Sequence, residues 1–247
     1  MSNLIEVINL KREFIVGTET VHALRGISFS IAKGEFVSIM GSSGSGKTTL
    51  LNLLGCLDTP TSGEYRLDGI SVKEMNKDQR AMLRNRKIGF VFQAYNLLAK
   101  TTALENVELP LIYNASFSSH DRRTKAVEML KQVGLGDRMY HTSNQLSGGQ
   151  QQRVAIARAL INEPAIILTD EATGNLDTRT SYEILSIFQR LHQEQGRTIV
   201  FITHNPELAS FSSRNIVLKD GKIVQDIMNP SIASAQEMLL QLPKQDD

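Results

Sequence analysis

Two long stretches near the start of the chain mix β-branched and apolar residues with polar interruptions, at residues 4–14 and 21–31. Such a pattern is typical of strands that bury one face and expose the other. A Thr/Pro/Ser/Gly turn signal at 59–63 precedes a further short alternating segment at 64–69. We therefore expect antiparallel β-structure in the N-terminal part.

Four other short segments are predominantly apolar: 35–40, 88–92, 165–170 and 198–204. Apolar runs of this length predict strands buried on both faces, as in a parallel sheet. A helix-compatible segment at 181–193 joins the last two and gives the order strand, helix, strand. The pattern predicts an α/β fold with a mixed, mainly parallel sheet.

Between about 95 and 160 the chain changes to helix-compatible sequence, with apolar residues at helical spacing in 122–133. We interpret this part as a helical subdomain inserted into the α/β core. Residues 1–226 then form one domain, and 227–247 form a C-terminal tail. Within the tail, 231–242 is compatible with a short helix and 243–247 is expected to be loose.

Composition narrows the class of protein. The 247 residues are 41% hydrophobic, which suffices for a core, and 27 Lys+Arg balance 26 Asp+Glu. Without an excess of positive charge, nucleic acid is not an expected partner. The apolar runs are too short to span a bilayer, and the first residues lack the features of a secretory signal, so we expect a cytosolic chain. The single Cys56 lies in an apolar segment and predicts a buried, inert thiol.

The strongest chemical signal follows the apolar segment 35–40. It is a phosphate-loop pattern, G-x-x-x-x-G-K-[ST], formed by Gly41, Ser42, Ser43, Gly44, Ser45, Gly46, Lys47 and Thr48. The glycines let backbone N–H groups point at phosphate oxygens, Lys47 can reach the β- and γ-phosphates, and Thr48 offers a hydroxyl to Mg²⁺. A flexible linker is the alternative, but a linker does not sit between a buried strand and an apolar helix, here about 48–56. The fold class becomes a phosphate-loop NTPase core.

Polar residues end the other apolar segments. Asp170 can hold Mg²⁺ through water, and Glu171 can orient and deprotonate an attacking water, although such a pair can also simply face solvent. The amide of Gln93 suits Mg²⁺ or the same water. His204 can donate to the γ-phosphate, or it is a hydrogen-bonded core residue. Because ligands of open α/β sheets bind at the carboxyl ends of strands, we expect these side chains to meet near Gly41.

A second anion site is predicted at Leu146, Ser147, Gly148, Gly149 and Gln150. Ser147 is a plausible N-cap for the strong helix former that follows, and free N–H groups lie beyond it. An ordinary capped helix with a glycine turn explains the same residues. The helical insertion separates this loop from Lys47 in the sequence, so the loop can contact a phosphate bound at Lys47 only if the folded or assembled protein brings the two together.

In their order along the chain, these motifs resemble the nucleotide-binding subunits of ATP-binding cassette (ABC) transporters, over about residues 4–226. The resemblance implies an ATPase that binds ATP and Mg²⁺ and works as a homodimer stacked head to tail. Each signature loop, 146–150, then caps the nucleotide held by the other subunit's phosphate loop, whose contacts run on to Thr49. It also implies that Phe14 stacks on adenine, where tyrosine is commoner and plain strand core is the alternative, and that Asp177 lies in a loop at the dimer interface. Ala172 departs from the family's usual proline.

Segments 41–52, 88–93 and 103–111 look like the branch that includes macrolide-exporter (MacB-type) and lipoprotein-release (LolD-type) cassettes. The branch implies a permease partner with few transmembrane helices and a large extracytoplasmic domain, room for a periplasmic adaptor, and a peripheral place on the cytoplasmic face of the inner membrane. Either a groove for a permease helix or ordinary core explains an apolar cluster after Gln93: Tyr95, Leu97, Leu98, Leu104 and Val107.

Two other classes of protein compete with this interpretation. A soluble cassette in translation usually carries two cassettes, and one in DNA maintenance carries long coiled coils; a single compact neutral cassette fits neither. A phosphate-loop kinase or GTPase has no use for residues 146–150. The transported substrate is not encoded in these motifs.

Overall fold

The computed structural model describes residues 3–114 and 116–243 and contains two sheets that share a core. The N-terminal sheet is antiparallel, as expected, with the order β2-β1-β4-β5. Its strands are β1 (Asn3–Val16), β2 (Glu19–Ala32), β4 (Ser62–Leu67) and β5 (Ile70–Ser71). Strand β1 pairs along its whole length with β2, and the hairpin turns at 17–18.

The second sheet has the order β10-β9-β3-β8-β7-β6. Its strands are β3 (Phe36–Met40), β6 (Ile88–Phe92), β7 (Ile166–Asp170), β8 (Thr198–Thr203), β9 (Arg214–Lys219) and β10 (Lys222–Met228). All its neighbours are parallel except the β9–β10 hairpin at one edge. Every position of β8 is buried, which agrees with its unbroken apolar sequence.

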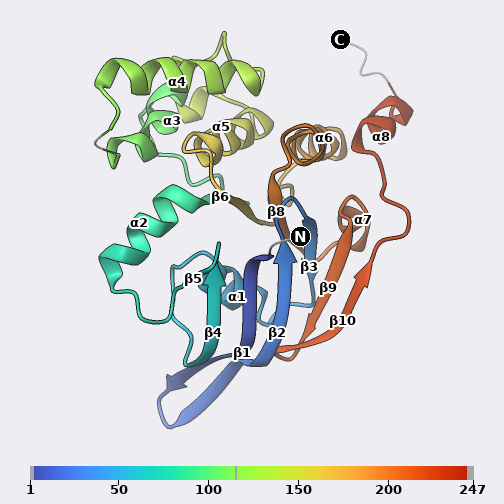
Figure 1. Ribbon diagram of the computed structural model, residues 1–247. Helices are drawn as coiled ribbons and strands as arrows, with labels where there is room; N and C mark the ends of the chain where they lie inside the picture. Colours follow the sequence, from blue (N-terminus) through green and yellow to red (C-terminus); the bar gives the residue numbers. More distant parts are fainter. Residues whose placement is uncertain (1–2, 115, 244–247) are drawn as a thin grey trace.

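The chain fills the space on both sides of this sheet with helices. Helix α1 (Lys47–Leu54) shares one apolar core with the antiparallel sheet and with β3, β7 and β8. The opposite side is covered by α3 (Ala103–Ile112), α4 (Ser119–Gln132), η1 (Ser143–Gln145), α5 (Gly148–Leu160) and α6 (Thr178–Gln195). In Figure 1 the green and yellow helices α3, α4 and α5 stand apart from the blue N-terminal sheet, with β6 leading toward them.

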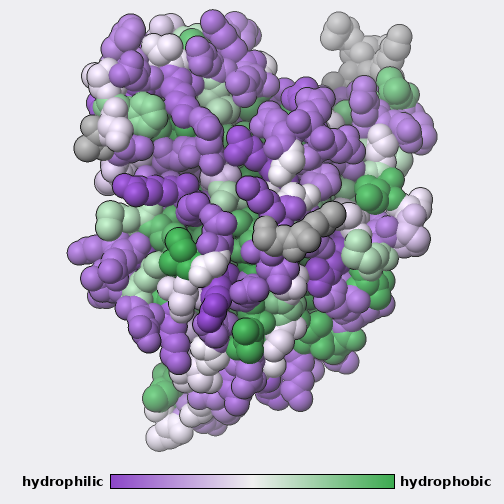
Figure 2. All heavy atoms as spheres, viewed as in Figure 1, coloured by the Kyte–Doolittle hydropathy of each residue, from purple (hydrophilic) through white to green (hydrophobic). Residues whose placement is uncertain are grey.

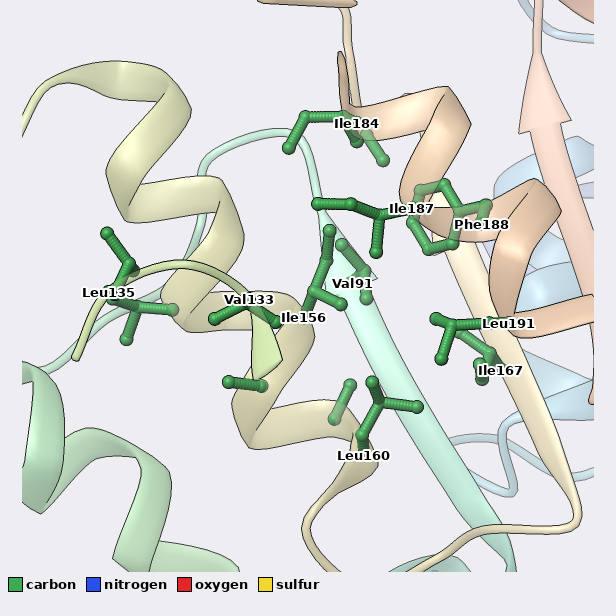
Figure 3. Packing of buried hydrophobic residues seen from close by; sticks show 14 of the residues in the cluster. Val91, Val133, Leu135, Ile156, Leu160, Ile167, Ile184, Ile187, Phe188 and Leu191 are labelled. Atoms are coloured by element: carbon green, nitrogen blue, oxygen red, sulfur yellow. The ribbon is translucent and has the colours of Figure 1, made fainter. Parts of the chain in front are cut away.

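The inserted helices start where their sequence caps them. Capping boxes begin α3 at Thr102 and Glu105, α4 at Ser118 and Asp121, and α5 at Ser147 and Gln150. Figure 3 shows how the helical part joins the sheet, because Ile156 of α5 and Ile187 of α6 point toward Val91 of β6.

Sequence patterns had not indicated four elements: α2, α7, β9 and β10. Helix α2 (Lys77–Lys87) is polar and basic, with Leu83 as its buried residue, so its apolar periodicity is weak. Helix α7 (Pro206–Ala209) is a single turn, and β9–β10 carries the sheet to Met228. Helix α8 (Ala235–Gln241) occupies the segment expected to form a terminal helix, and of the tail expected to be loose, residues 244–247 lie outside the described part.

On the face drawn in Figure 2, hydrophilic side chains dominate and apolar ones form separate small groups. Within residues 3–114 and 116–243, none of the helices combines the length and the apolarity that a membrane crossing requires.

Candidate functional site

A cleft of about 1410 Å³ opens where the parallel strands end. The loop after β3 forms one wall, and the residues that follow β6, β7 and β8 form another. The predicted residues that line it are Gly41, Ser42, Ser43, Gly44, Gly46, Lys47, Thr48, Thr49, Gln93, Asp170, Glu171 and His204. The expected convergence of strand ends is therefore present.

The loop between β3 and α1 curls around the ammonium group of Lys47. Lys47 Nζ donates to the carbonyl of Gly41 at 2.7 Å and to that of Ser42 at 2.9 Å. Gly46 has φ 105°, and a Cβ there would lie 2.7 Å from the carbonyl oxygen of Ala23, so both its conformation and its surroundings require glycine. The hydroxyl of Ser45 is buried without a partner among the described residues. The loop is thus shaped as a concave site with one positive charge at its centre.

Asp170 ends β7 inside the cleft. Burial raises the pKa of this carboxyl above its usual range, the neighbouring charge of Glu171 raises it further, and Lys47 lowers it. Ionisation of this carboxyl is therefore less favourable in the free folded protein than in water. A bound cation offsets that cost, because it stabilises the negative carboxylate.

We expect Asp170→Asn to raise the melting temperature of the nucleotide-free chain at pH 7. A carboxyl whose pKa is higher in the folded than in the unfolded state destabilises the fold when it is ionised. This destabilisation of the wild type is absent at pH values below the pKa of Asp170 in the unfolded chain, and it is complete above the pKa in the folded chain. The increase in melting temperature caused by Asp170→Asn should therefore disappear as the pH falls below about 4. Thermal melts at several pH values test this. A melting temperature that falls at pH 7 would contradict it.

Glu171 follows Asp170 and contacts His204 directly. His204 Nδ1 lies 2.6 Å from Glu171 Oε1, so the ring donates this proton to the carboxylate. The backbone of Glu171 is left-handed, with φ 47°, which is uncommon for any residue other than glycine. The turn is closed by the N–H of Gly174 donating to the carbonyl of Glu171 at 2.8 Å. This unusual turn aims the carboxylate at the cleft.

Gln93 reaches across to the loop after Glu171. Its Nε2 donates to Asn175 Oδ1 at 3.0 Å, and Asn175 Nδ2 donates back to the Gln93 carbonyl at 3.3 Å. No sequence pattern predicts this role of Asn175, because residues 82 positions apart give no local signal. Ala172 is buried in the same loop, and its carbonyl accepts from Gln152 Nε2 of α5 at 2.6 Å.

The segment 146–150 does not line this cleft. Ser147 caps α5, as expected, through its hydroxyl and the N–H of Gln150. A Cβ on Gly148 would lie 2.8 Å from the Tyr95 hydroxyl, and one on Gly149 would collide with Thr180 of α6. Asp177 caps α6 and accepts from the Thr180 hydroxyl at 2.6 Å. Within one chain, the two predicted anion sites therefore stay apart.

Phe14 lies opposite Val21 in the β1–β2 hairpin and is 37% exposed. The Arg12 guanidinium covers its ring at 4.4 Å from the centroid. Phe14 is not among the lining residues of the cleft, whereas Thr20, Val21 and His22 of β2 are. The sequence does not indicate these three residues, because exposed residues of a strand carry no motif.

The oxygen donors around Lys47 suit a hard cation. The Thr48 hydroxyl, the Gln93 amide and the Asp170 carboxylate all line the cleft, and oxygen ligands are those that Mg²⁺ prefers. The described residues contain no group of three or more His, Cys, Asp or Glu that could hold a metal ion. These three side chains therefore fit a Mg²⁺ that is also held by phosphate oxygens.

A second concave surface, of about 740 Å³, lies between α2, β6, the end of α3 and the end of α5. We call it the α2–α3 groove. Its apolar walls come from Met82, Phe90, Phe92, Leu109, Pro110 and Tyr113. The apolar cluster after Gln93 does not line this groove. Its members Leu104 and Val107 are buried core, which is the alternative given for them, and Leu97 packs against that core. Leu98 is 47% exposed, and Tyr95 also lies outside the groove. Of the segment after Gln93, Asn96 lines it.

Comparisons with known proteins agree with this geometry. A family model described as "ABC transporter" matches residues 24–174. An ABC transporter ATP-binding protein of Thermotoga maritima is 53% identical over 223 residues, which is 90% of this chain and 94% of that protein. The macrolide export ATP-binding/permease protein MacB of Syntrophobacter fumaroxidans is 52% identical over 90% of this chain, which spans only 31% of the relative's length.

The solved structures that resemble this chain are also ATP-binding cassettes. A dimeric, post-hydrolysis structure of the ATP-binding cassette MJ0796, whose sequence comes from Methanocaldococcus jannaschii, is bound to ADP and Pi. It has 46% identity and a TM-score of 0.85, and it covers 92% of this chain and 99% of its own. Cassette cbiO1 of Clostridium perfringens, from the complex cbiONQ, has 26% identity and a TM-score of 0.81 over 98% of this chain and 92% of its own.

Proposed function

This chain belongs to the ABC transporter family as an ATP-binding subunit, and on that premise we propose that its cleft binds MgATP and hydrolyses it with Glu171 as the general base. The observation that carries the proposal is the arrangement across the cleft: the Lys47 ammonium inside the glycine loop on one side, and the Glu171–His204 pair on the other. Phosphate release from MgATP by the wild type and by Glu171→Gln tests it.

In this mechanism each side chain has a separate task. Lys47 exchanges its bonds to the Gly41 and Ser42 carbonyls for β- and γ-phosphate oxygens, and the N–H groups of the loop hold the same phosphates. Thr48, Gln93 and Asp170 would hold Mg²⁺, which neutralises charge that develops on the transferred group. Val21 and His22 of the hairpin line the same cleft and are available to contact the rest of the nucleotide.

Glu171 accepts the proton of the attacking water, and its contact with His204 fixes where the carboxylate points. Because His204 Nδ1 donates to Glu171, the neutral ring leaves Nε2 without a proton. The ring can donate from Nε2 to the γ-phosphate only when both nitrogens are protonated.

We also propose that two copies of the chain share each site. The signature segment 146–150 lies outside the cleft of its own chain, yet the N-terminus of α5 presents N–H groups that suit a phosphate. A head-to-tail homodimer brings the segment of one copy to the cleft of the other, with Asp177 at the contact. The dimeric cassette structures support this arrangement for the chain.

The α2–α3 groove is the proposed docking surface for a membrane permease. The MacB relatives carry ATP-binding and permease parts in one protein, which supports a permease as the partner of this chain and a peripheral place at the cytoplasmic face of the inner membrane. We propose further that this permease has few transmembrane helices and that a periplasmic adaptor works with it. The permease would choose the substrate.

We expect Met82→Asp to abolish copurification with the permease. Met82 is 55% exposed and lines the groove, so a charge there is tolerated in the free chain but is buried without a partner in the complex. Met228→Asp is the matched control, because Met228 is 65% exposed on β10, away from the groove. The measurement is the permease retained on the tagged chain, with melting temperature and ATP binding unchanged. Retention by Met82→Asp would place the docking surface elsewhere.

A further inference from the structure

The ring of His204 has little that holds it in place. His204 follows β8 directly, and its side chain is 64% exposed. Among the described residues the ring has one hydrogen-bond partner, Glu171 at 2.6 Å. A ring with a single contact lies where its own backbone puts it. The segment 203–209, which fixes that backbone, therefore decides how well His204 meets Glu171.

The short helix α7 forms most of this segment and begins two residues after His204. Asn205 connects the two. Its N–H donates to the Thr203 hydroxyl at 3.0 Å, and its side-chain oxygen accepts from the N–H of Glu207 at 2.9 Å. A single helical turn forms too few internal hydrogen bonds to be stable by itself. The position of α7, and of His204 with it, therefore depends on contacts with neighbouring elements.

One such contact joins α7 to α6. The hydroxyl of Tyr182 on α6 donates to Glu207 Oε1 at 2.6 Å, and within the described residues no other hydrogen bond links these two helices. The Tyr182 ring is buried, with its centroid 5.8 Å from that of Phe211. The bond to the carboxylate raises the pKa of Tyr182, so the phenol stays a donor at neutral pH. A hydrogen bond to a charged acceptor is stronger than one between neutral groups.

Helix α6 is the better anchored of the two helices. It is 18 residues long, Asp177 caps its first turn, and one of its faces is buried. Glu183, the neighbour of Tyr182, pairs with Arg153 of α5 at 2.9 Å. Because α6 is fixed in this way, the Tyr182 hydroxyl holds α7 rather than the reverse.

A hollow of about 260 Å³ lies beside this bond. Its lining includes Tyr182, Glu207, Glu171 and His204. Since no protein atoms fill the hollow, packing does not hold the His204 turn on that side. Glu171 and His204 also line the nucleotide cleft, whereas Tyr182 and Glu207 do not. The tyrosine and its acid can therefore affect the reaction only through the residues that border both spaces.

Resting on the proposed role of Glu171 and His204 in ATP hydrolysis, we infer that Tyr182 and Glu207 are positioning residues for His204. The bond between them fixes α7, so that the histidine ring stays in line with the Glu171 carboxylate. Neither side chain reaches the nucleotide cleft. Loss of the bond therefore lowers the rate of the bound complex and leaves its affinity for MgATP unchanged.

Tyr182→Phe tests the inference, because it keeps the ring beside Phe211 and removes only the hydroxyl. The kcat for MgATP hydrolysis should fall about tenfold, since small displacements of groups around a reacting centre cost rate on this scale. KM and the melting temperature should stay at wild-type values. Tyr140→Phe is the matched control, because Tyr140 is 64% exposed and borders neither the cleft nor the hollow.

The acid provides a second pair of variants. Glu207→Ala removes the acceptor and should reproduce the loss of kcat. Glu207→Gln should keep most of the wild-type rate, because its amide oxygen still accepts from the Tyr182 hydroxyl. Glu207 is exposed, so neither change threatens the fold.

Two further measurements separate positioning from a general structural defect. In a His204→Ala background, Tyr182→Phe should change phosphate release by less than about twofold, because residues that act through one group are not additive. In the nucleotide-free chain, the ring nitrogen NMR shifts of His204, identified by their absence from His204→Ala, should change in Tyr182→Phe. The same shifts should be unchanged in Tyr140→Phe.

The inference is overturned if Tyr182→Phe keeps the wild-type kcat, or if the His204 shifts stay unchanged. It is also overturned if the losses from Tyr182→Phe and His204→Ala multiply, because Tyr182 would then act on another group. Should Tyr182→Phe melt early, Glu207→Ala decides by the same criteria. The NMR result does not depend on hydrolysis. Near wild-type turnover by Glu171→Gln would therefore remove the proposed base, while the shifts would still show whether Tyr182 positions His204.

Discussion

Glu171→Gln should bind MgATP normally and hydrolyse it roughly 10²- to 10⁴-fold more slowly than the wild type, the range expected for loss of a general base. The amide keeps the size of the carboxylate and can still hold a water, but it cannot accept the water's proton. Because the nucleotide is no longer consumed, the variant should accumulate as an ATP-bound dimer. Phosphate release and size-exclusion chromatography with ATP measure the two effects.

His204→Ala is a useful companion variant, because it keeps the Glu171 carboxylate and removes the ring that donates to it at 2.6 Å. Glutamine at 171 should cost more activity than alanine at 204 if Glu171 is the base. The assignment would be wrong if Glu171→Gln released phosphate at a near wild-type rate and eluted only as a monomer with ATP.

Mixing a Lys47→Ala chain with a Ser147→Arg chain should restore hydrolysis that neither variant shows alone. Each parent dimer has two defective composite sites. A mixed dimer contains one intact phosphate loop facing one intact signature, so the mixture should exceed both parents severalfold. Steady-state phosphate release over a series of mixing ratios, with subunit exchange followed by differently tagged chains, provides the measurement.

Ser147 is suited to this test because it is exposed and caps α5, away from the cleft of its own chain. A bulky arginine there should block the facing nucleotide site without touching Lys47. If proven mixed dimers never exceed the parents, each chain hydrolyses ATP alone and the shared-site proposal is wrong.

The sequence located the chemistry of the cleft well because strand ends are predictable. Apolar runs that end at Met40, Phe92, Asp170 and Thr203 form one parallel sheet, so Lys47, Gln93, Glu171 and His204 had to meet at one edge. The phosphate loop and the Ser147 cap depend on residues that are close together in the sequence, so they can be predicted without knowing the tertiary structure. Family, fold class and ATPase function were accordingly predicted correctly.

The groove was harder to predict, because burial on a helix depends on partners distant in sequence. Leu104 and Val107 look no different from Met82 or Tyr113 in the sequence, yet α4 and α5 bury the first two and leave the others exposed. Helix α2 was missed since polar residues dominate it. The hydrogen bonds from Arg158 to the carbonyls of Tyr95 and Asn96 span more than 60 positions and follow from no motif.

The left-handed backbone of Glu171 has a consequence for how this protein responds to directed evolution. A residue other than glycine at φ 47° stores about 1–3 kcal/mol of strain. Selecting variants for heat resistance alone should therefore favour glycine or asparagine at position 171, and each such winner would lose the proposed base. Each round of selection for thermal stability should therefore include an assay of ATP hydrolysis, because a single substitution at position 171 would raise stability and abolish turnover together.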